Sequence, residues 1–243
     1  MKIFPVVHIG GGEKGLSQAV TQSELAFEHD ADGVYLIRHA AGETAVAELF
    51  RAYAAVRQAT PQESYVGINI LQARSPREAV AMTKQEVVGI AAPSGLWVDD
   101  ITWHGHDADM LAHVRKTPRL DGMRTLGGVA FKYTDSYTED PAEAATQAYM
   151  YNNFADVLVT SGPETGRSAD PQKTRAMKRQ LATGESGEGL LALASGIDID
   201  NIADFEGSVD EVLVASSVET EKGSGIFDEA KLRDLIQAAH KLA

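Results

Sequence analysis

The chain alternates short apolar runs with longer stretches in which apolar residues recur every three or four positions. Short apolar runs bounded by turn residues are typical of buried strands, and the wider spacing is typical of amphipathic helices. Strands are expected at residues 3–9, 33–37, 65–71, 95–102, 127–134, 155–160, 190–194 and 211–215. Helices are expected at residues 17–30, 44–58, 76–85, 107–117, 141–152, 170–181 and 228–242. Strands that alternate with helices in this way predict a parallel sheet.

The number of strand–helix units predicts a single (β/α)8 TIM barrel that occupies residues 1–243 as one α/β domain. Hydrophobic residues make up 44% of the chain, which is enough for one large core, and no Pro- or Gly-rich linker divides it. A doubly wound open sheet is the alternative. It is disfavoured because HIGGGEKG, after the first expected strand, matches the dinucleotide-binding fingerprint only weakly.

Charge and cysteine content narrow the classes of partner. A formal net charge of −13 repels nucleic-acid phosphates, so no broad nucleic-acid-binding face is expected. The chain has no cysteine, which excludes disulfides, thiolate nucleophiles and cysteine-based zinc sites and fits a reducing cytoplasm. Neither a signal peptide nor an apolar run of membrane-spanning length is recognised, so a cytoplasmic location is expected. Alanines in the last expected helix are compatible with a homo-oligomer.

The last two expected strands both run into small, polar turns. Ser195-Gly196 follows one strand and Ser216-Ser217 follows the other. Small residues let backbone N–H groups approach a ligand, and a helix beginning just after each turn would direct its positive end at an anion. The loops after strands 7 and 8 of a TIM barrel are a frequent phosphate site. A phosphorylated small molecule is therefore the expected ligand, although ordinary turn geometry also accounts for these residues.

Active sites of TIM barrels lie at the carboxyl ends of the strands. Residues at these ends are His8, Arg38, His39, Asn69, Asp99, Asp100, His104, Lys132, Thr160, Glu164, Thr165, Ser195 and Ser216. An unpaired buried ammonium is costly, so Lys132 indicates anion binding, acid–base chemistry or a Schiff base. A lysine that reaches solvent at the rim is the non-functional alternative.

Asp99 and Asp100 are neighbours on one expected strand, so their side chains point to opposite faces and do not form an aspartic dyad. The one that faces the mouth would be a general base or a Mg²⁺ ligand. Mg²⁺, bound by Asp99 or Asp100, is the one cofactor compatible with these residues, and the sequence contains no metal-binding motif. His104 and His106 lack a second group of ligands at helix spacing, which favours a solvated loop. His8, Lys132 and the two aspartates are the expected catalytic residues.

The expected substrate- and phosphate-binding residues extend beyond the two small turns. They are Ser195, Gly196, Ser216, Ser217, Asn69, Arg38, Gly162 and Thr165. Gly162 and Thr165 belong to a Gly-containing loop after the sixth expected strand, where close approach to a ligand is allowed. The absence of GxSxG, HExxH and Walker A motifs disfavours serine hydrolysis, zinc proteolysis and P-loop ATP hydrolysis.

Several blocks, taken in order, resemble the BtpA/SgcQ family of barrel proteins. They are VVHIG, ADGVYLI, VGINIL, VAFKYT, ADVLVTSGPETGRSADP, LASGIDIDNI and VDEVLVASSVETEKG, and they extend from about His8 to the end of the chain. The resemblance implies a barrel akin to ribulose-phosphate-type barrels that bind phosphorylated ligands. The chain departs from the family in its top loops. GGGEKG replaces a PG-containing loop, Arg38-His39 replaces an acidic-Asn pair, and Tyr133 replaces a histidine after Lys132.

Two kinds of function follow. One is an enzyme that acts on a phosphorylated sugar or nucleotide-like molecule by isomerisation, lyase chemistry, or transfer of a glycosyl or phosphoribosyl group, with nucleotide sugars among the substrates. Lys132 and one aspartate would then act at the reacting carbon, while His8 and Asn69 orient it. The other, implied by the resemblance, is a non-catalytic barrel that binds a partner and stabilises an assembly.

Overall fold

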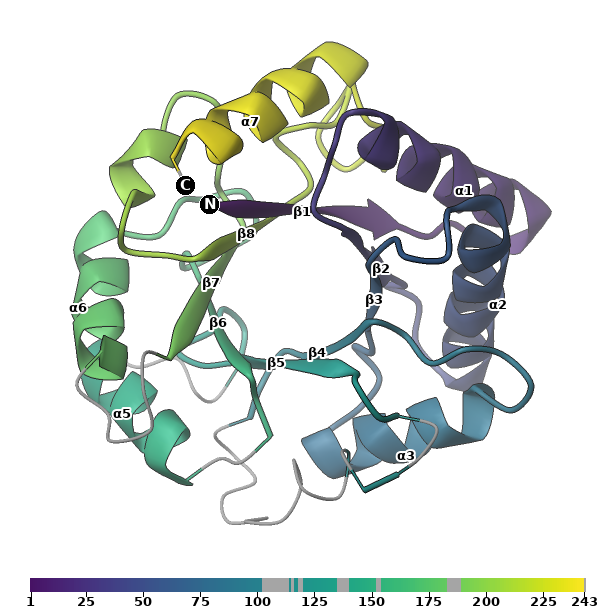
Figure 1. The fold of residues 1–243 in the computed structure, drawn as a ribbon, viewed down its shortest axis with the longest axis horizontal. Coiled ribbons are helices and arrows are strands. Elements are labelled where there is room, and N and C mark those ends of the chain that lie inside the picture. The colour runs from purple at the N-terminus through teal and green to yellow at the C-terminus, as the bar shows by residue number, and fades with distance from the viewer. Residues whose placement is uncertain are drawn as a thin grey trace.

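A computed structural model describes residues 1–101, 114, 116–117, 120–134, 140–151, 154–182 and 189–242. Its eight strands pair in sequence order, all in parallel, and β8 pairs with β1 to close a barrel (Figure 1). The strands are β1 (Lys2–His8), β2 (Val34–Ile37), β3 (Val66–Asn69), β4 (Gly95–Val98), β5 (Arg124–Gly128), β6 (Val157–Ser161), β7 (Leu190–Ala194) and β8 (Glu211–Val214). The predicted TIM barrel is confirmed.

Helices surround the barrel and cover the outer faces of the strands (Figure 1). They are α1 (Gly12–Glu28), α2 (Glu43–Ala59), α3 (Pro76–Glu86), α5 (Pro141–Tyr151), α6 (Pro171–Ala182) and α7 (Glu229–Lys241), with a short 3-10 helix, η1 (Ile202–Phe205). Most of the expected helix at residues 107–117, together with His104 and His106, lies outside the described residues. In the described ranges, no helix has the length and apolar character needed to cross a bilayer.

Alternating strand residues divide the apolar core into two parts. On β1, Phe4 and Val6 belong to a cluster inside the barrel, whereas Ile3 and Val7 pack against the helices. Strands covered on both faces are apolar at most positions, which is why the sequence shows nearly continuous rather than alternating apolar runs. The alternation also determines which side chains at the strand ends face the barrel interior.

Large polar side chains fill the amino-terminal half of the barrel. The hydroxyl groups of Tyr35 and Tyr65 lie 2.6 Å apart, and Arg124 pairs with the buried Glu211 at 2.6 Å. Burial raises the pKa of Tyr35 well above its usual value, and proximity to Tyr65 adds to the effect. Gly95 leaves room for both tyrosine hydroxyls, because a Cβ atom there would lie 2.6 Å from that of Tyr35. These groups occupy the end of the barrel away from the loops that follow the strands.

The fifth strand differs from its prediction at residues 127–134, because β5 runs from Arg124 to Gly128. The apolar residues that suggested a longer strand, Val129 to Phe131, are buried after the chain has left the sheet. Ala130 has a φ of 48°, in the left-handed region, which ends the extended conformation. Lys132 therefore lies in the loop after β5 rather than on the strand.

Candidate active site

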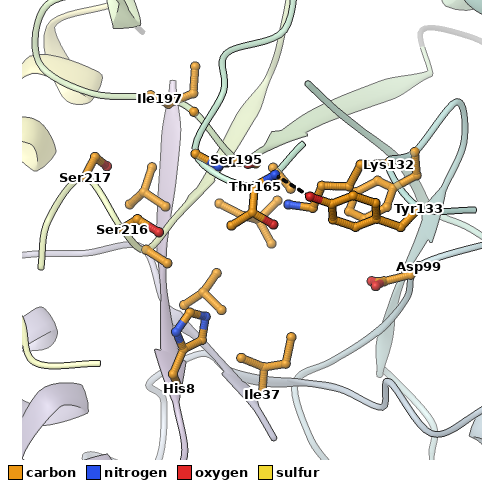
Figure 2. Close-up of a pocket in the computed structure, with 18 of the residues that line it drawn as sticks. His8, Ile37, Asp99, Lys132, Tyr133, Thr165, Ser195, Ile197, Ser216 and Ser217 are labelled. Atoms are coloured by element: carbon orange, nitrogen blue, oxygen red, sulfur yellow. Dashed lines mark hydrogen bonds between the residues drawn. The ribbon is translucent and has the colours of Figure 1, made fainter. Parts of the chain in front are cut away.

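A cavity of about 530 Å³ opens at the carboxyl ends of the strands (Figure 2). Residues from the ends of all eight strands or from the loops that follow them line it. Predicted residues that line it are His8, His39, Asp99, Lys132, Thr165, Ser195, Gly196, Ser216 and Ser217. The fold thus brings together residues that are more than 200 positions apart in the sequence.

Asp99 is the aspartate that faces the cavity. It follows β4 on the same face as Trp97, whose ring lies inside the barrel, and its carboxylate points into the cavity in Figure 2. Asn69 is buried below it and donates a hydrogen bond of 2.7 Å from Nδ2 to Asp99 Oδ1. Burial raises the pKa of Asp99, while the Asn69 hydrogen bond and the charge of Lys132 oppose the rise. Asp99 can thus accept or donate a proton, and Asn69 orients it.

Lys132 extends from the loop after β5 towards the centre of the cavity (Figure 2). Its Nζ atom lies 5.6 Å from the centroid of the Phe131 ring, and the ammonium forms no ion pair within the described ranges. Burial lowers the pKa of Lys132, and the negative charge of Asp99 acts in the opposite direction. A lowered pKa increases the fraction of neutral amine, the form that acts as a base or nucleophile.

A second lysine, Lys173 of α6, holds the loops around this group. Its Nζ atom donates hydrogen bonds to the carbonyl oxygens of Ala130, at 2.7 Å, and Ser161, at 2.8 Å. The Ser161 hydroxyl in turn accepts a hydrogen bond of 2.8 Å from the backbone N–H of Lys132. Burial lowers the pKa of Lys173 to about 8. Lys173 therefore supports the loop that carries Lys132.

His8 enters the cavity from the end of β1, on a different wall from Asp99 (Figure 2). Its Nδ1 atom lies 3.4 Å from Oε1 of Glu219, whose side chain is fully buried. The ring of His39 meets the His8 ring edge-on, with centroids 5.0 Å apart. Burial lowers the pKa of His39, and the charges of His8, Lys132 and Arg38 contribute. Glu219 orients His8, while His39 adds a second imidazole to the same wall.

The turns after β7 and β8 place backbone N–H groups on residues that line the cavity. The N–H of Ser195 donates to Leu213, and that of Val218 donates to Ala215. Within the described ranges, the N–H groups of Gly196, Ile197, Ser216 and Ser217 in these turns have no acceptor. All four residues line the cavity. We call these four residues the N–H cradle. Backbone N–H groups without acceptors are able to bind an anion when they converge, and phosphate binding here stays a prediction.

The turn after β7 has an unusual backbone conformation. Ser195 and Gly196 have φ values of 87° and 74°, both in the left-handed region. The Ser195 hydroxyl accepts a hydrogen bond of 3.0 Å from the N–H of Gly166, in the loop after β6. Strain at a non-glycine residue in a loop is a feature of functional sites. The helix expected directly after each turn is absent, because residues 189–242 are all described and contain only η1 and α7 after β7.

Lys222, from the loop after β8, also lines the cavity. Its side chain lies over Gly166, where a Cβ atom would approach Lys222 Nζ to 2.5 Å. An exposed ammonium beside free backbone donors adds positive charge to an anion site. Lys222 is thus a side-chain cation at the edge of the cavity, near the turns after β7 and β8.

Three predicted binding residues lie away from the cavity wall. Arg38 pairs with Glu48 at 2.8 Å and donates to the carbonyl of Ile9 at 3.3 Å. Asn69 lies beneath Asp99. Gly162 permits the close approach of the Arg167 backbone, which a side chain there would obstruct. Their observed contacts serve the scaffold of the site, and their roles in binding stay predictions. Asp100 is half-buried and does not line the cavity.

Sequence reasoning missed Glu219, Lys222, Lys173 and Trp97. Glu219 and Lys222 follow the Ser216-Ser217 turn within six residues. Candidates were selected only at the ends of the expected strands, and a selection that included the whole loop after the eighth strand would have found both. Lys173 belongs to a helix, where nothing in the sequence distinguishes it from a solvent-exposed lysine. Among the described residues no group of three or more His, Asp or Glu residues could hold a metal ion. Binding of Mg²⁺ by Asp99 therefore stays a prediction.

Comparison with known proteins shows the fold but no family. No family model and no curated protein matches the chain, so its membership of the BtpA/SgcQ family stays a prediction. A structure described as "Native KDPGal structure" is similar at a TM-score of 0.64 and 14% identity, over 100% of this chain and 96% of the other. Phosphoribosyl anthranilate isomerase, in complex with reduced 1-(o-carboxyphenylamino)-1-deoxyribulose 5-phosphate, has a TM-score of 0.61 and 11% identity, with 99% of each chain covered. Tryptophan synthase subunit alpha from Legionella pneumophila has a TM-score of 0.61 and 13% identity, over 99% and 93% of the chains.

Proposed function

We propose that the chain is an enzyme that binds a phosphorylated small molecule and transfers protons next to a carbonyl group, as isomerases and lyases do. The observation that carries the proposal is the N–H cradle, formed by Gly196, Ile197, Ser216 and Ser217. Buried or partly buried backbone donors without acceptors are rare in folded proteins, and a phosphate would satisfy them. Lys222 would add the positive charge that a phosphomonoester requires.

The acid–base part of the proposal is supported by two groups on separate walls of the cavity (Figure 2). Isomerisation removes a proton from one atom and returns a proton to its neighbour, so it uses a base and an acid. His8, held by Glu219, and Asp99, with its raised pKa, suit these two roles. Lys132 would stabilise negative charge that develops on the carbonyl oxygen, or attack the carbonyl as a neutral amine.

The compared structures are consistent with this proposal. Phosphoribosyl anthranilate isomerase has the same barrel fold and was solved with a ligand named as a 5-phosphate. Phosphoribosyl or glycosyl transfer would place a diphosphate on the same N–H cradle, and a ligand screen distinguishes these classes. The assembly role implied by the BtpA resemblance requires no phosphorylated ligand.

Calorimetry and thermal-shift measurements test the N–H cradle directly. The ligands are inorganic phosphate, sugar phosphates, phosphoribosyl pyrophosphate, nucleotides and nucleotide sugars, with and without Mg²⁺. A ligand that binds the folded state raises its melting temperature by mass action. Ser216→Asp should abolish binding by repulsion, and Lys222→Gln should weaken it about tenfold, as expected when one charged contact of about 1.4 kcal/mol is lost. Lys241→Gln, at the end of α7, is the matched control with the same charge change.

Absence of binding by every phosphorylated ligand would refute the proposal and favour the assembly role. Once a substrate is known, Asp99→Asn and His8→Gln should each lower kcat by about 10²–10⁴, the usual contribution of general acid–base catalysis. Ligand affinity should change little, because neither side chain belongs to the N–H cradle.

A further inference from the structure

The cavity contains an amine for which the chain supplies no partner. Lys132 is half-buried, and its side chain extends towards the centre of the cavity, where a ligand can reach its Nζ atom (Figure 2). Within the described ranges this atom has neither a hydrogen-bond acceptor nor an ion-pair partner. Lys178 shows the contrasting arrangement, because its Nζ atom donates to both carboxylate oxygens of Asp210, at 2.8 and 3.0 Å. Lys132 is thus placed to act on a ligand rather than to stabilise the fold.

The backbone that carries this amine is fixed before any ligand binds. The N–H of Lys132 donates to the Ser161 hydroxyl at 2.8 Å. The carbonyl of Ala130, two residues earlier, accepts a hydrogen bond of 2.7 Å from Lys173 Nζ. Only the side-chain torsions of Lys132 remain to be ordered when a ligand arrives, and groups positioned in this way react faster than free ones.

Asp99 and Lys132 both favour their uncharged forms. Burial is the largest cause of both shifts: it raises the pKa of Asp99 and lowers the pKa of Lys132, and it outweighs the attraction between their charges. An uncharged amine has the lone pair that attacks a carbonyl carbon. An uncharged carboxyl group can donate a proton to the carbonyl oxygen. The two groups therefore meet the needs of addition to a carbonyl group.

Lys222 is the other lysine among the described residues that line the cavity. It is exposed at the rim and lies over Gly166. Ser216 and Ser217 of the N–H cradle lie on a different wall from Lys132 (Figure 2). A ligand whose phosphate contacts the cradle and Lys222 would therefore extend towards Lys132 with the rest of its structure. The position of each lysine suits a different part of one ligand.

We propose that the substrate is a phosphorylated aldehyde or ketone and that Lys132 forms a covalent imine with its carbonyl carbon. The inference rests on the proposed function for the phosphate, and it goes further by committing to one intermediate and one substrate class. Nucleotide sugars and phosphoribosyl pyrophosphate are then not substrates, because they have no free aldehyde or ketone group.

The imine forms in two stages, with Asp99 moving the protons. The Nζ lone pair of Lys132 bonds to the carbonyl carbon, the π pair moves to the oxygen, and the oxygen takes the proton of Asp99. The nitrogen of this carbinolamine then returns a proton to Asp99. That proton passes to the hydroxyl group, which leaves as water while the nitrogen lone pair forms the C=N bond. The resulting iminium accepts the electron pair of an adjacent C–H or C–C bond, the step that isomerases and lyases share.

Reductive trapping tests for the imine directly. The full chain is incubated with glycolaldehyde phosphate, dihydroxyacetone phosphate or ribulose 5-phosphate. Sodium borohydride then delivers a hydride to the imine carbon and converts the adduct to a stable secondary amine, which peptide mass spectrometry locates. We expect at least one probe to label Lys132 about tenfold more than Lys222 or the exposed Lys241 of α7, because only Lys132 combines a desolvated amine with a neighbouring acid.

Two variants separate the covalent step from binding. Lys132→Arg keeps the positive charge but forms no imine, so the adduct should disappear while the affinity for inorganic phosphate changes less than about twofold, since no contact of the N–H cradle is lost. Asp99→Asn removes the acid, so labelling of Lys132 should slow by about 10²-fold or more. The labelling of the wild-type chain decides the question even if a variant fails to fold.

The inference is overturned if no probe labels Lys132, or if Lys222 and Lys241 are labelled equally with it. Binding of inorganic phosphate without labelling of Lys132 would leave the proposed function standing and refute only the imine. Unphosphorylated dihydroxyacetone distinguishes the opposite case. If it labels Lys132 as fast as dihydroxyacetone phosphate and inorganic phosphate does not bind, the imine stands and the N–H cradle, with the proposed function, is refuted.

Discussion

The Nδ1 atom of His8 and the Oε1 atom of Glu219 lie 3.4 Å apart, with the Glu219 side chain fully buried. The same carboxylate accepts hydrogen bonds from the backbone N–H groups of Gly223, at 2.5 Å, and Gly225, at 3.2 Å. A carboxylate held in this way accepts a hydrogen bond from Nδ1–H and so selects one imidazole tautomer. The Nε2 atom of His8 is then left as the acceptor available to a substrate.

This contact predicts the protonation pattern of His8 without knowledge of the substrate. In the neutral imidazole, the proton should reside on Nδ1, and ¹⁵N chemical shifts of the ring nitrogens measure this. Glu219→Gln should shift the tautomer balance towards Nε2–H. Glu229→Gln is the matched control, because it removes a surface carboxylate 3.3 Å from Nε2 of His29. An unchanged His8 spectrum in Glu219→Gln would show that the carboxylate does not orient the ring.

The pH dependence of stability should report the same carboxylate. Burial alone would raise the pKa of Glu219, but hydrogen bonds from His8, Gly223 and Gly225 outweigh it and hold the pKa below 4.5. A carboxyl group whose pKa is lower in the folded than in the unfolded state stabilises the protein at pH values above its unfolded-state pKa. This stabilisation is lost as the pH falls through its folded-state pKa. Urea denaturation between pH 6 and 3 should therefore show a steeper loss in the wild type than in Glu219→Gln. Equal slopes would contradict the lowered pKa.

Lys173 should titrate near pH 8, as measured by NMR of its ε-carbon. Its pKa is lowered on folding, so the unfolded state binds more protons between about pH 8 and 10.5, and the unfolding free energy should rise with pH in that window. At pH 7, Lys173→Met leaves the carbonyls of Ala130 and Ser161 without this donor and should cost about 2 kcal/mol. The exposed Lys14→Met is the control. A cost below that of the control would mean that Lys173 does not support the loop.

Gly95 should tolerate no side chain. A Cβ atom there would collide with the hydroxyl of Tyr65 and approach that of Tyr35 to 2.6 Å. Gly95→Ala should lower the unfolding free energy by about 1–3 kcal/mol, the usual cost of overpacking a core. Gly11→Ala is the control, since the nearest atom to its added Cβ would be 3.5 Å away on Arg38. Similar denaturation midpoints for the two variants would show that the tyrosine pair can move aside.

The local sequence determined the elements of this protein. Strand β7 agrees with its predicted bounds at both ends, because its run of apolar residues is bounded by a glycine and by a small polar turn. Periodic apolar spacing similarly predicted α2 and α3 to within one residue at each end. Eight strand–helix units in order predicted a parallel barrel. Because active sites of such barrels lie at the carboxyl ends of the strands, His8 and Lys132 were then selected as candidates by their position.

Pattern alone could not place β5, because residues buried beneath a loop and residues buried in a strand are equally apolar. Val129 and Phe131 are buried in the loop after β5, and the hydropathy of the sequence does not indicate the change of backbone direction at Ala130. The sequence also did not show that no helix begins directly after the Ser195 and Ser216 turns, because glycine and serine permit many loop conformations.

Only the tertiary structure decided which partners the site residues have. Alternation showed that one of Asp99 and Asp100 faces inward, but the barrel register chose Asp99 and placed Asn69 beside it. Glu219 reaches His8 across 211 positions of sequence, and Lys222 reaches Gly166 from another loop. Hydropathy and propensity act over a few residues, whereas hydrogen bonds, pKa shifts and cavity walls arise from contacts that closing the barrel creates.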